Sequence, residues 1–354
     1  MHTLYVKEAT TDATAGFRRL IAQALTGLLL AGLGAAAHAQ TAAPGYTLTP
    51  FAAGAAIGAS APDSLAVSGG DVFVGYGNGV DSTGAGGNAT STIAEYTTGG
   101  SLEKVYKLVG GNDGLRVDPK TGLLWVLQNQ DGNSLLDVVN PRTGAVNTYT
   151  YSGNLHPDYS GYDDIVFQGG TAYLSATNPA TPGDAVLYKT STRLPKPGGV
   201  VKLTPILSAS LNGDLPNAGS LVDTDSLALT PGGNLLLDDQ GGSPLGTAPL
   251  PSLTWVGAPG TRYQETFQIF PKDQAGNSLS VDDTRFAPFG SHQLLIADTS
   301  KNVVYSLTGR FRPLGAYTAT KSRGTVGALS LENGVVTPLA TGLGSPHGLA
   351  FIVR

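Results

Sequence analysis

The chain of 354 residues contains no cysteine. Disulfides, thiolate metal sites and cysteine nucleophiles are therefore excluded. Charged residues make up only 13% of the chain, and the formal net charge is −5. Because phosphate binding requires a basic face and the sequence shows none, nucleic acid is not expected as a partner. Stability must come from apolar burial and backbone pairing.

Long apolar runs are scarce as well. The run Leu20–Leu33 is shorter than the ~20 residues that a membrane-spanning helix needs. It follows the pair Arg18-Arg19 and precedes Ala37-His38-Ala39, which has the small-x-small pattern of a signal-peptide cleavage site. The sequence thus predicts an export signal over residues 1–39, cleavage near Ala39-Gln40, and a periplasmic or secreted protein with no membrane span. The paired arginines also fit the twin-arginine route, but ordinary secretion is the favoured interpretation.

Helical periodicity is absent after residue 40, whereas 49 glycines and 22 prolines indicate many short strands joined by tight turns. A short inner-strand pattern, with a polar start and then alternating apolar residues, recurs at spacings of 50, 51, 61, 58 and 64 residues. Its starts are Asp63, Asp113, Asp164, Asp225, Asp283 and His347. This period indicates radial repetition. We predict an all-β fold with one domain over residues 40–354, a six-bladed β-propeller of four-stranded antiparallel blades, with five or seven blades as alternatives.

Strands from both ends are expected to close the ring. The pattern at His347 has no blade after it, and Tyr46–Phe51 reads as a lone outer strand before the first repeat. The fifth unit is expected to take Gln293–Ala297 and Val303–Leu307 as its next strands, followed by an irregular segment over Arg310–Arg323.

Two motifs resemble known propellers. Residues 112–126, Asn-Asp-Gly-Leu-Arg-Val-Asp-Pro-Lys-Thr-Gly-Leu-Leu-Trp-Val, are similar to a block of the regucalcin/gluconolactonase-like family. Residues 296–305, Ile-Ala-Asp-Thr-Ser-Lys-Asn-Val-Val-Tyr, resemble the blade motif shared by that family and the NHL-repeat propellers. The likeness extends over the mature chain at the level of the repeat.

The resemblance implies a divalent cation at the channel mouth, held by a Glu, an Asn and an Asp from three blades. Asp225 falls on the metal-binding Asp of that family, and Asn112 falls on an Asn that contacts substrate. The family's Glu has no counterpart here, since Ala61-Pro62-Asp63 stands in its place.

The residues that open the inner strands converge on one rim of a propeller channel. Oxygen ligands in such a ring suit a divalent cation, with Ca²⁺ first and Mg²⁺ next, and a histidine among them also admits Zn²⁺ or Mn²⁺. The candidate metal ligands are Asp63, Asp164, Asp225 and Asp283. The alternative is that these aspartates only cap turns by accepting backbone N–H bonds.

Crowded carboxylates raise one another's pKa, which suits acid–base work near neutral pH. The candidate catalytic residues are therefore Asp164, Asp225 and His347. Asn112, Asp113 and the loop residue His156 are the candidate substrate-binding residues. No nucleotide, haem or nucleophile-elbow motif is visible.

Three functions follow from these patterns. The first is an exported, metal-dependent hydrolase of a small lactone or ester. The second is a non-catalytic NHL-type propeller that binds a peptide, glycan or protein at its rim. The third is a lyase with His347 as base. A propeller fold alone does not choose among them.

Overall fold

Short strands build the computed structural model, which describes residues 39–152, 160–181, 183–210, 221–241 and 250–353. Strands of two to eight residues alternate with turns, many of which contain glycine at positive φ. Within the described residues there is no α-helix, and the two short 3₁₀ segments are η1 (Gly54–Ile57) and η2 (Lys321–Arg323). No described helix is long and apolar enough to cross a membrane.

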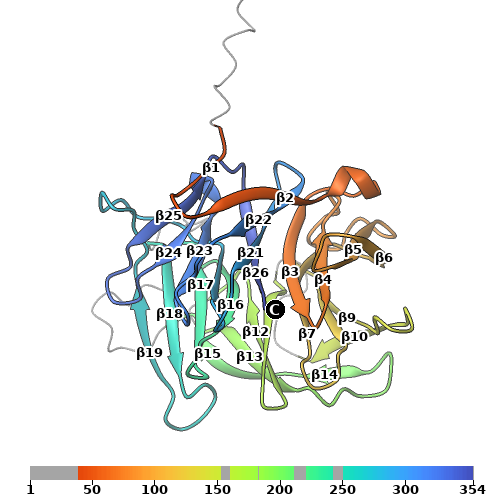
Figure 1. Ribbon diagram of the computed structural model, residues 1–354. Helices are drawn as coiled ribbons and strands as arrows, with labels where there is room; N and C mark the ends of the chain where they lie inside the picture. The colour runs from red at the N-terminus through yellow and green to blue at the C-terminus, as the bar shows by residue number, and fades with distance from the viewer. Residues whose placement is uncertain (1–38, 153–159, 182, 211–220, 242–249, 354) are drawn as a thin grey trace, which may run out of the picture. The chain divides into compact units, whose positions relative to one another are not determined.

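The strands form six sheets arranged as the blades of a propeller (Figure 1). Blade 1 contains β3 (Pro62–Ser68), β4 (Asp71–Tyr76), β5 (Thr90–Thr97) and β6 (Leu102–Val109). Blade 2 contains β7 (Asn112–Val117), β8 (Leu124–Gln128), β9 (Leu135–Val139), β10 (Val146–Ser152) and the added outer strand β14 (Val200–Lys202). Blade 3 contains β11 (Tyr162–Gln168), β12 (Thr171–Ala176), β13 (Ala185–Ser191) and β15 (Thr204–Ser208). Blade 4 contains β16 (Thr224–Leu229), β17 (Leu235–Asp239), β18 (Ser252–Gly257) and β19 (Glu265–Ile269).

The last two blades are interleaved along the chain. Blade 5 contains β20 (Asp283–Phe286), β23 (Ala316–Thr320), β24 (Thr325–Leu329), β25 (Val336–Thr341) and, at its outer edge, β1 (Thr41–Ala42). Blade 6 contains β26 (Pro346–Ile352), β21 (Gln293–Asp298), β22 (Val303–Thr308) and β2 (Thr47–Ala53). The chain therefore leaves blade 5 after its inner strand, forms the β21–β22 hairpin of blade 6, and then returns.

This path corrects one expectation from the sequence. The strands at 293–298 and 303–308 were expected in the fifth blade, but they pair with β26 and β2 in the sixth. Residues 310–323 were expected to be irregular, yet β23 lies within them and pairs with β20. A hairpin has the same local sequence pattern whichever inner strand it joins, so spacing alone does not assign it to a blade.

Six blades and closure by both ends are confirmed. Blade 6 has the C-terminal β26 as its innermost strand and the N-terminal β2 as its outermost strand. The pairings within the blades are antiparallel, apart from the added strand β14, which runs parallel to β10.

Apolar side chains fill the spaces between neighbouring blades. Phe73 and Tyr106 of blade 1 pack with Val126 of blade 2. Comparable apolar clusters lie between blades 2 and 3, 3 and 4, 4 and 5, and 5 and 6. The sixth cluster joins Tyr76 of blade 1 to Leu295 of blade 6, which completes the ring. Because each blade buries both faces against its neighbours, the inner strands are held close around the channel.

Candidate functional site

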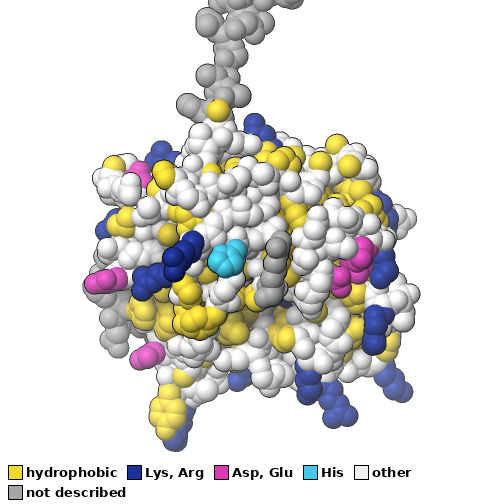
Figure 2. Space-filling view, viewed as in Figure 1, with side chains coloured by type: hydrophobic (Ala, Val, Ile, Leu, Met, Phe, Trp, Pro, Cys, Tyr) yellow, Lys and Arg dark blue, Asp and Glu magenta, His cyan; other side chains and the backbone are white. Residues whose placement is uncertain are grey.

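One residue from each inner strand, or directly before it, faces the channel mouth. These equivalent residues are Asp63, Asp113, Asp163, Asp225, Asp282 and His347. With their neighbours they line a cavity of about 230 Å³, which we call the channel cup. Nine aspartates line the cup, against two arginines, one lysine and one histidine. The cup thus contains nine of the 26 acidic residues of the chain, and acidic side chains are sparse on the face shown in Figure 2.

Local backbone irregularity turns these side chains into the channel. In β3, β7, β11 and β16 the pairing register shifts between the first and the fourth residue, and in β26 it shifts over residues 347–348. Such bulges kink a strand and re-aim the bulged side chain. In five of the six blades the polar residue at the strand start is thus tied to a bulge, whereas β20 pairs with β23 without a register shift and Asp282 directly precedes it.

Glycine follows the ring residue in two blades because neighbouring strands approach closely there. A Cβ on Gly114 would lie 2.0 Å from the carbonyl oxygen of Asp163, and one on Gly348 would lie 2.2 Å from that of Asp63. The Asp-Gly-Leu and His-Gly-Leu steps therefore reflect backbone crowding around the channel.

The structure shifts the ring register in two blades relative to the sequence expectation. Asp163 and Asp282 occupy the ring positions, whereas Asp164 and Asp283, which the sequence suggested as metal ligands, each lie one residue further along the chain. The signal was ambiguous because both places carry adjacent aspartates, and only the pairing register separates them.

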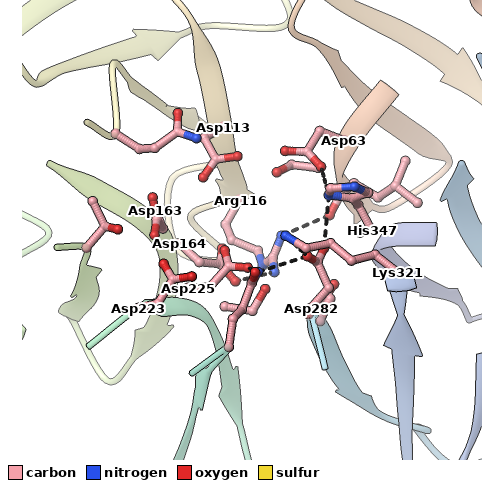
Figure 3. A pocket seen from close by; sticks show the side chains of 18 of the residues that line it. Asp63, Asp113, Arg116, Asp163, Asp164, Asp223, Asp225, Asp282, Lys321 and His347 are labelled. Carbon is pink, nitrogen blue, oxygen red and sulfur yellow. Dashed lines mark hydrogen bonds and ion pairs between the residues drawn. The ribbon is translucent and has the colours of Figure 1, made fainter. Parts of the chain in front are cut away.

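Asp113, Asp163 and Asp225 form one side of the cup (Figure 3). One carboxylate oxygen from each lies within 4.8 Å of the others. Asp163 is 5% exposed, and its Oδ1 has no hydrogen-bond partner among the described residues. Burial raises the pKa of all three carboxyls well above the usual range, and neighbouring carboxylates raise it further. Three clustered carboxylates, none of which forms an ion pair with another described residue, are a suitable ligand set for a divalent cation.

The opposite side of the cup contains Asp63, Asp282 and His347 (Figure 3). Nδ1 of His347 lies 2.9 Å from Oδ1 of Asp63 and 3.0 Å from Oδ2 of Asp282. Its Nε2 lies 3.0 Å from the hydroxyl oxygen of Ser345. Burial alone would lower the pKa of His347, but the two carboxylates raise it to about 10, so the imidazole is protonated at neutral pH. The imidazolium in turn lowers the pKa of Asp63 and Asp282 despite their burial.

Two further side chains that sequence reasoning missed link the two sides. Lys321, in η2 directly after β23, reaches from blade 5 toward the centre of the cup, and its Nζ lies 3.0 Å from Oδ1 of Asp282 (Figure 3). Gln240 donates from Nε2 to the carboxylates of both Asp225 and Asp282. Neither residue belongs to the repeated motif, so the sequence offered no signal for them.

Deeper in the channel, Asp164 is the centre of an ion network. Its Oδ2 lies 3.0 Å from Nη2 of Arg116 and 3.1 Å from Nη2 of Arg285, and it accepts the backbone N–H of Leu227. Asp283 pairs with Arg285 and accepts the backbone N–H of Leu349. These contacts join inner strands of blades 2 to 6 across the channel and form the floor of the cup.

The turn-capping alternative applies to the two floor aspartates and not to the ring. Asp164 and Asp283 accept backbone N–H bonds. Among the described residues, no backbone N–H donates to the carboxylates of the five aspartates at the ring positions. The repeated ring position is therefore polar for a reason other than local backbone capping.

The remaining predicted residues lie elsewhere. Asn112 is buried against blade 1, beside Gly75, and does not line the cup. Its neighbour Asp113 does line the cup. His156 lies outside the described residues.

The fold and cup define a class: a six-bladed β-propeller with an acidic mouth and an arginine–aspartate floor. No protein-family profile and no curated protein matches the chain. Among solved structures, a protein provisionally described as a gluconolactonase aligns with 12% identity and a TM-score of 0.50, over 88% of this chain and 90% of that chain. A structure of a nidogen/laminin complex aligns with 10% identity and a TM-score of 0.50, over 83% of this chain and 86% of that chain. The predicted resemblance to gluconolactonase-like and NHL-type propellers is thereby confirmed at the level of the fold.

Proposed function

We propose that the channel cup binds a divalent cation between Asp113, Asp163 and Asp225, with Ca²⁺ as the first candidate, and hydrolyses a small lactone or ester there. The observation that carries the proposal is the group of three carboxylates from three adjacent blades, in which Oδ1 of Asp163 is buried and has no hydrogen-bond partner in the part of the chain that the structure describes. Burying ionised carboxylates without a positive partner is costly, and a cation removes that cost. A bound cation would polarise a carbonyl group or activate a water molecule.

The other side of the cup has a different task in this proposal. The ammonium group of Lys321, held by Asp282, stabilises an oxygen that gains negative charge during hydrolysis. Both ring nitrogens of His347 are engaged, and the ring is protonated, so it positions Asp63 and Asp282 and does not act as the base of a lyase.

One observation favours the second candidate, a propeller that binds a ligand without catalysis. Among the described lining residues the cup offers no unengaged histidine nitrogen, so a general base would have to be an aspartate, and the aspartates with the most raised pKa are the same ones that would hold the cation. A cation site would then serve to bind an oxygen-rich peptide or glycan ligand at the rim.

The cation site is tested by calorimetric titration of the mature protein with Ca²⁺, Mg²⁺, Mn²⁺ and Zn²⁺ after chelation. Wild type should bind about one ion per chain with a rise in melting temperature, and Asp163→Asn should weaken binding tenfold or more. In the chelated state Asp163→Asn should melt at or above the wild-type temperature, because it removes like-charge repulsion.

Asp71→Asn is the matched control, since Asp71 belongs to a separate acidic group on blade 1 with Glu95 and Glu103. Equal loss of binding in both variants, or no binding by wild type, would refute the cation site. Hydrolysis of δ-valerolactone or 4-nitrophenyl acetate that depends on the added ion supports the enzyme, and cation binding without turnover supports the binding propeller.

We also propose that residues 1–39 direct export and are removed. The paired arginines, the apolar run and the Ala-His-Ala motif support this. Mass spectrometry of the protein from the periplasm or medium should find an N-terminus at Gln40, and retention of the leader in a cytoplasmic protein would contradict it.

A further inference from the structure

The end of the propeller opposite the cup is formed by the turns that follow each inner strand and each third strand. Because the inner strands begin at the cup and neighbouring strands within a blade are antiparallel, these turns meet at the other end of the channel. Each of the first five blades contributes two such turns, and blade 6 contributes one, between β22 and β23. We call this end the lower face. All eleven of its turns lie within the described residues.

The exposed charges on the lower face are mostly positive. Its turns contain seven exposed basic residues and one exposed acidic residue, Glu332. When Asp71 and Glu265 are included, which open the strands after two of the turns, the balance is still seven to three. The basic residues are Lys120, Arg142, Arg193, Lys196, Arg262, Arg310 and Arg312.

This positive face belongs to a chain with a formal net charge of −5. Nine aspartates line the cup at the other end of the channel. Figure 2 shows the lower face, where Lys and Arg side chains lie around the edge and acidic side chains are few. The basic residues come from separate turns, so the sequence shows no basic cluster. The folded protein therefore has one positive and one negative end.

Exposed apolar side chains gather at the same end. The structure describes eleven large apolar side chains that are exposed, and seven of them lie in these turns or directly beside them. Single exposed apolar residues are ordinary, but their concentration on one face marks an interaction surface. The seven are Leu102, Val146, Val200, Tyr263, Phe289, Leu314 and Val353.

Two neighbouring turns bring apolar and basic side chains together. The backbone N–H of Leu314 donates to the carbonyl oxygen of Ala287 at 2.7 Å, which holds the turn after β22 beside the turn after β20. Phe289, which is 70% exposed, belongs to the turn after β20. Arg310 and Arg312 belong to the turn after β22 and are exposed. Apolar side chains beside basic ones suit a membrane surface, where the apolar groups enter the boundary between headgroups and acyl chains and the cations contact anionic headgroups.

We propose that the lower face docks on a bilayer that contains anionic phospholipids, with Phe289, Leu314 and Tyr263 at the boundary between headgroups and acyl chains. Arg262, whose guanidinium carbon lies 4.6 Å from the centre of the Tyr263 ring, adds a second pair of aromatic and basic side chains. A nucleic acid would leave the apolar side chains in water, so a lipid surface fits better. In this orientation the acidic cup faces away from the bilayer, which avoids repulsion between its aspartates and the lipid phosphates.

Sedimentation of the full mature chain with vesicles tests the proposal. A chelator is present, so that no divalent ion links the cup to lipid. One set of vesicles contains phosphatidylcholine alone, and the other contains equal parts of phosphatidylcholine and phosphatidylglycerol. Affinity for the mixed vesicles should be about tenfold higher or more, and it should fall about tenfold between about 50 mM and 500 mM NaCl. Equal affinity for both vesicles, or no sedimentation with either, overturns the proposal.

Substitution of basic residues then locates the docking face. Arg310→Gln together with Arg312→Gln should weaken binding to the mixed vesicles about fivefold or more. The matched control is Lys301→Gln together with Arg323→Gln, which removes the same charge from two exposed residues at the cup end. This control should stay within about twofold of wild type. Equal weakening by both pairs would show that only net charge matters and would overturn the docking face.

Substitution of Phe289 tests the apolar contact. Phe289→Ser should weaken binding about threefold or more and leave the melting temperature unchanged, because the ring is exposed. Leu250→Ser is the matched control, since Leu250 is 61% exposed but directly precedes β18 at the cup end. Binding that Phe289→Ser leaves intact would overturn the apolar contact. A short DNA duplex that binds as tightly as the mixed vesicles would overturn the assignment to lipid.

Discussion

The pKa values of the ring aspartates depend on whether their neighbours are other aspartates or His347. Five ring positions carry aspartate, and the sixth carries His347. Where three aspartates meet, their pKa values rise, whereas beside His347 the pKa values of Asp63 and Asp282 fall. The ring is thus divided into a half in which three carboxylates crowd one another and a half in which the His347 imidazolium neutralises part of the negative charge.

The internal cation makes stability depend on pH. The pKa of His347 is about 10 in the folded protein against 6.5 for an ordinary histidine, so the folded state binds the extra proton between these values. Its contribution is complete below pH 6.5 and is lost as the pH rises through 10. We expect the free energy of unfolding to fall over this interval by at most about 1.4 kcal/mol per pH unit, with this slope missing in His347→Gln.

Urea unfolding at several values between pH 6 and 10 measures this slope. The exposed His292 provides the matched variant His292→Gln, which should retain the wild-type slope. Parallel curves for wild type and His347→Gln would show that the imidazolium does not contribute to stability.

The sequence predicted that acidic residues ring the channel, but it did not predict every residue that faces the channel. Asp63, Asp113 and Asp225 were identified as facing the channel because each opens a repeat. Asp163 was weighed at the rim only beside Asp164, and Asp283 was chosen where Asp282 faces the mouth. A bulge in β11 decides the first case, whereas in blade 5 the ring aspartate directly precedes β20, which has no register shift. Lys321 was missed because its position depends on the return of the chain to blade 5.

The inner strands and their bulges are the elements that position the site. Each begins at the mouth and runs down the channel, so residues three apart lie at different depths. Asp113 reaches the mouth and Arg116 reaches the floor from one strand. The acidic mouth and the arginine–aspartate floor are therefore two levels along the inner strands.

Ring closure depends on the contact between β2 and β22. Thr47 and Thr308 are directly paired there, are both exposed, and are 261 residues apart. Because the chain has no cysteine, Thr47→Cys with Thr308→Cys would create the only disulfide. We expect it to raise the free energy of unfolding by about 2–5 kcal/mol in the oxidised form.

The matched control joins Ala328 to Thr337, which are paired within blade 5. A cysteine pair there closes a much shorter loop and should stabilise less. Thermal melts with and without reductant compare the two proteins. Equal gains from both disulfides would argue that closure by the two ends does not limit the stability of the ring.

Sequence periodicity predicts the strands but not all of their pairing partners. Strands and turns could be predicted from alternation and from glycine and proline, and the six inner strands from their shared start. The partner of the β21–β22 hairpin could not be predicted, because the local sequence pattern of the hairpin is the same whether it joins β20 or β26.

The ion network around Asp164, at the floor of the cup, connects several blades of the molecule to one another. Asp164 of blade 3 contacts Arg116 of blade 2, Arg285 of blade 5 and the backbone of blade 4. Burial raises its pKa even though the arginines oppose the rise. A buried carboxylate with two guanidinium partners is costly to remove because both partners lose their counter-charge.

Asp164→Asn should therefore lower the free energy of unfolding by about 3–5 kcal/mol and leave cation affinity unchanged. The adjacent Asp163→Asn should do the reverse, with cation affinity lost and stability kept. Urea unfolding and calorimetry on both variants give the comparison. Loss of cation binding in Asp164→Asn without loss of stability would make Asp164 a metal ligand, as the sequence alone suggested.

The interleaving of blades 5 and 6 also limits how such a ring can change in evolution. A propeller with consecutive blades gains or loses one by duplication or deletion of a single stretch of the gene. Between β20 and β26 every such stretch encodes parts of two blades, so copying it adds strands that have no inner strand to join. A copied stretch is therefore least disruptive in the first four blades, where the one interruption among the described strands is β14 of blade 2, which lies between β13 and β15 of blade 3, and the last two blades are inherited together.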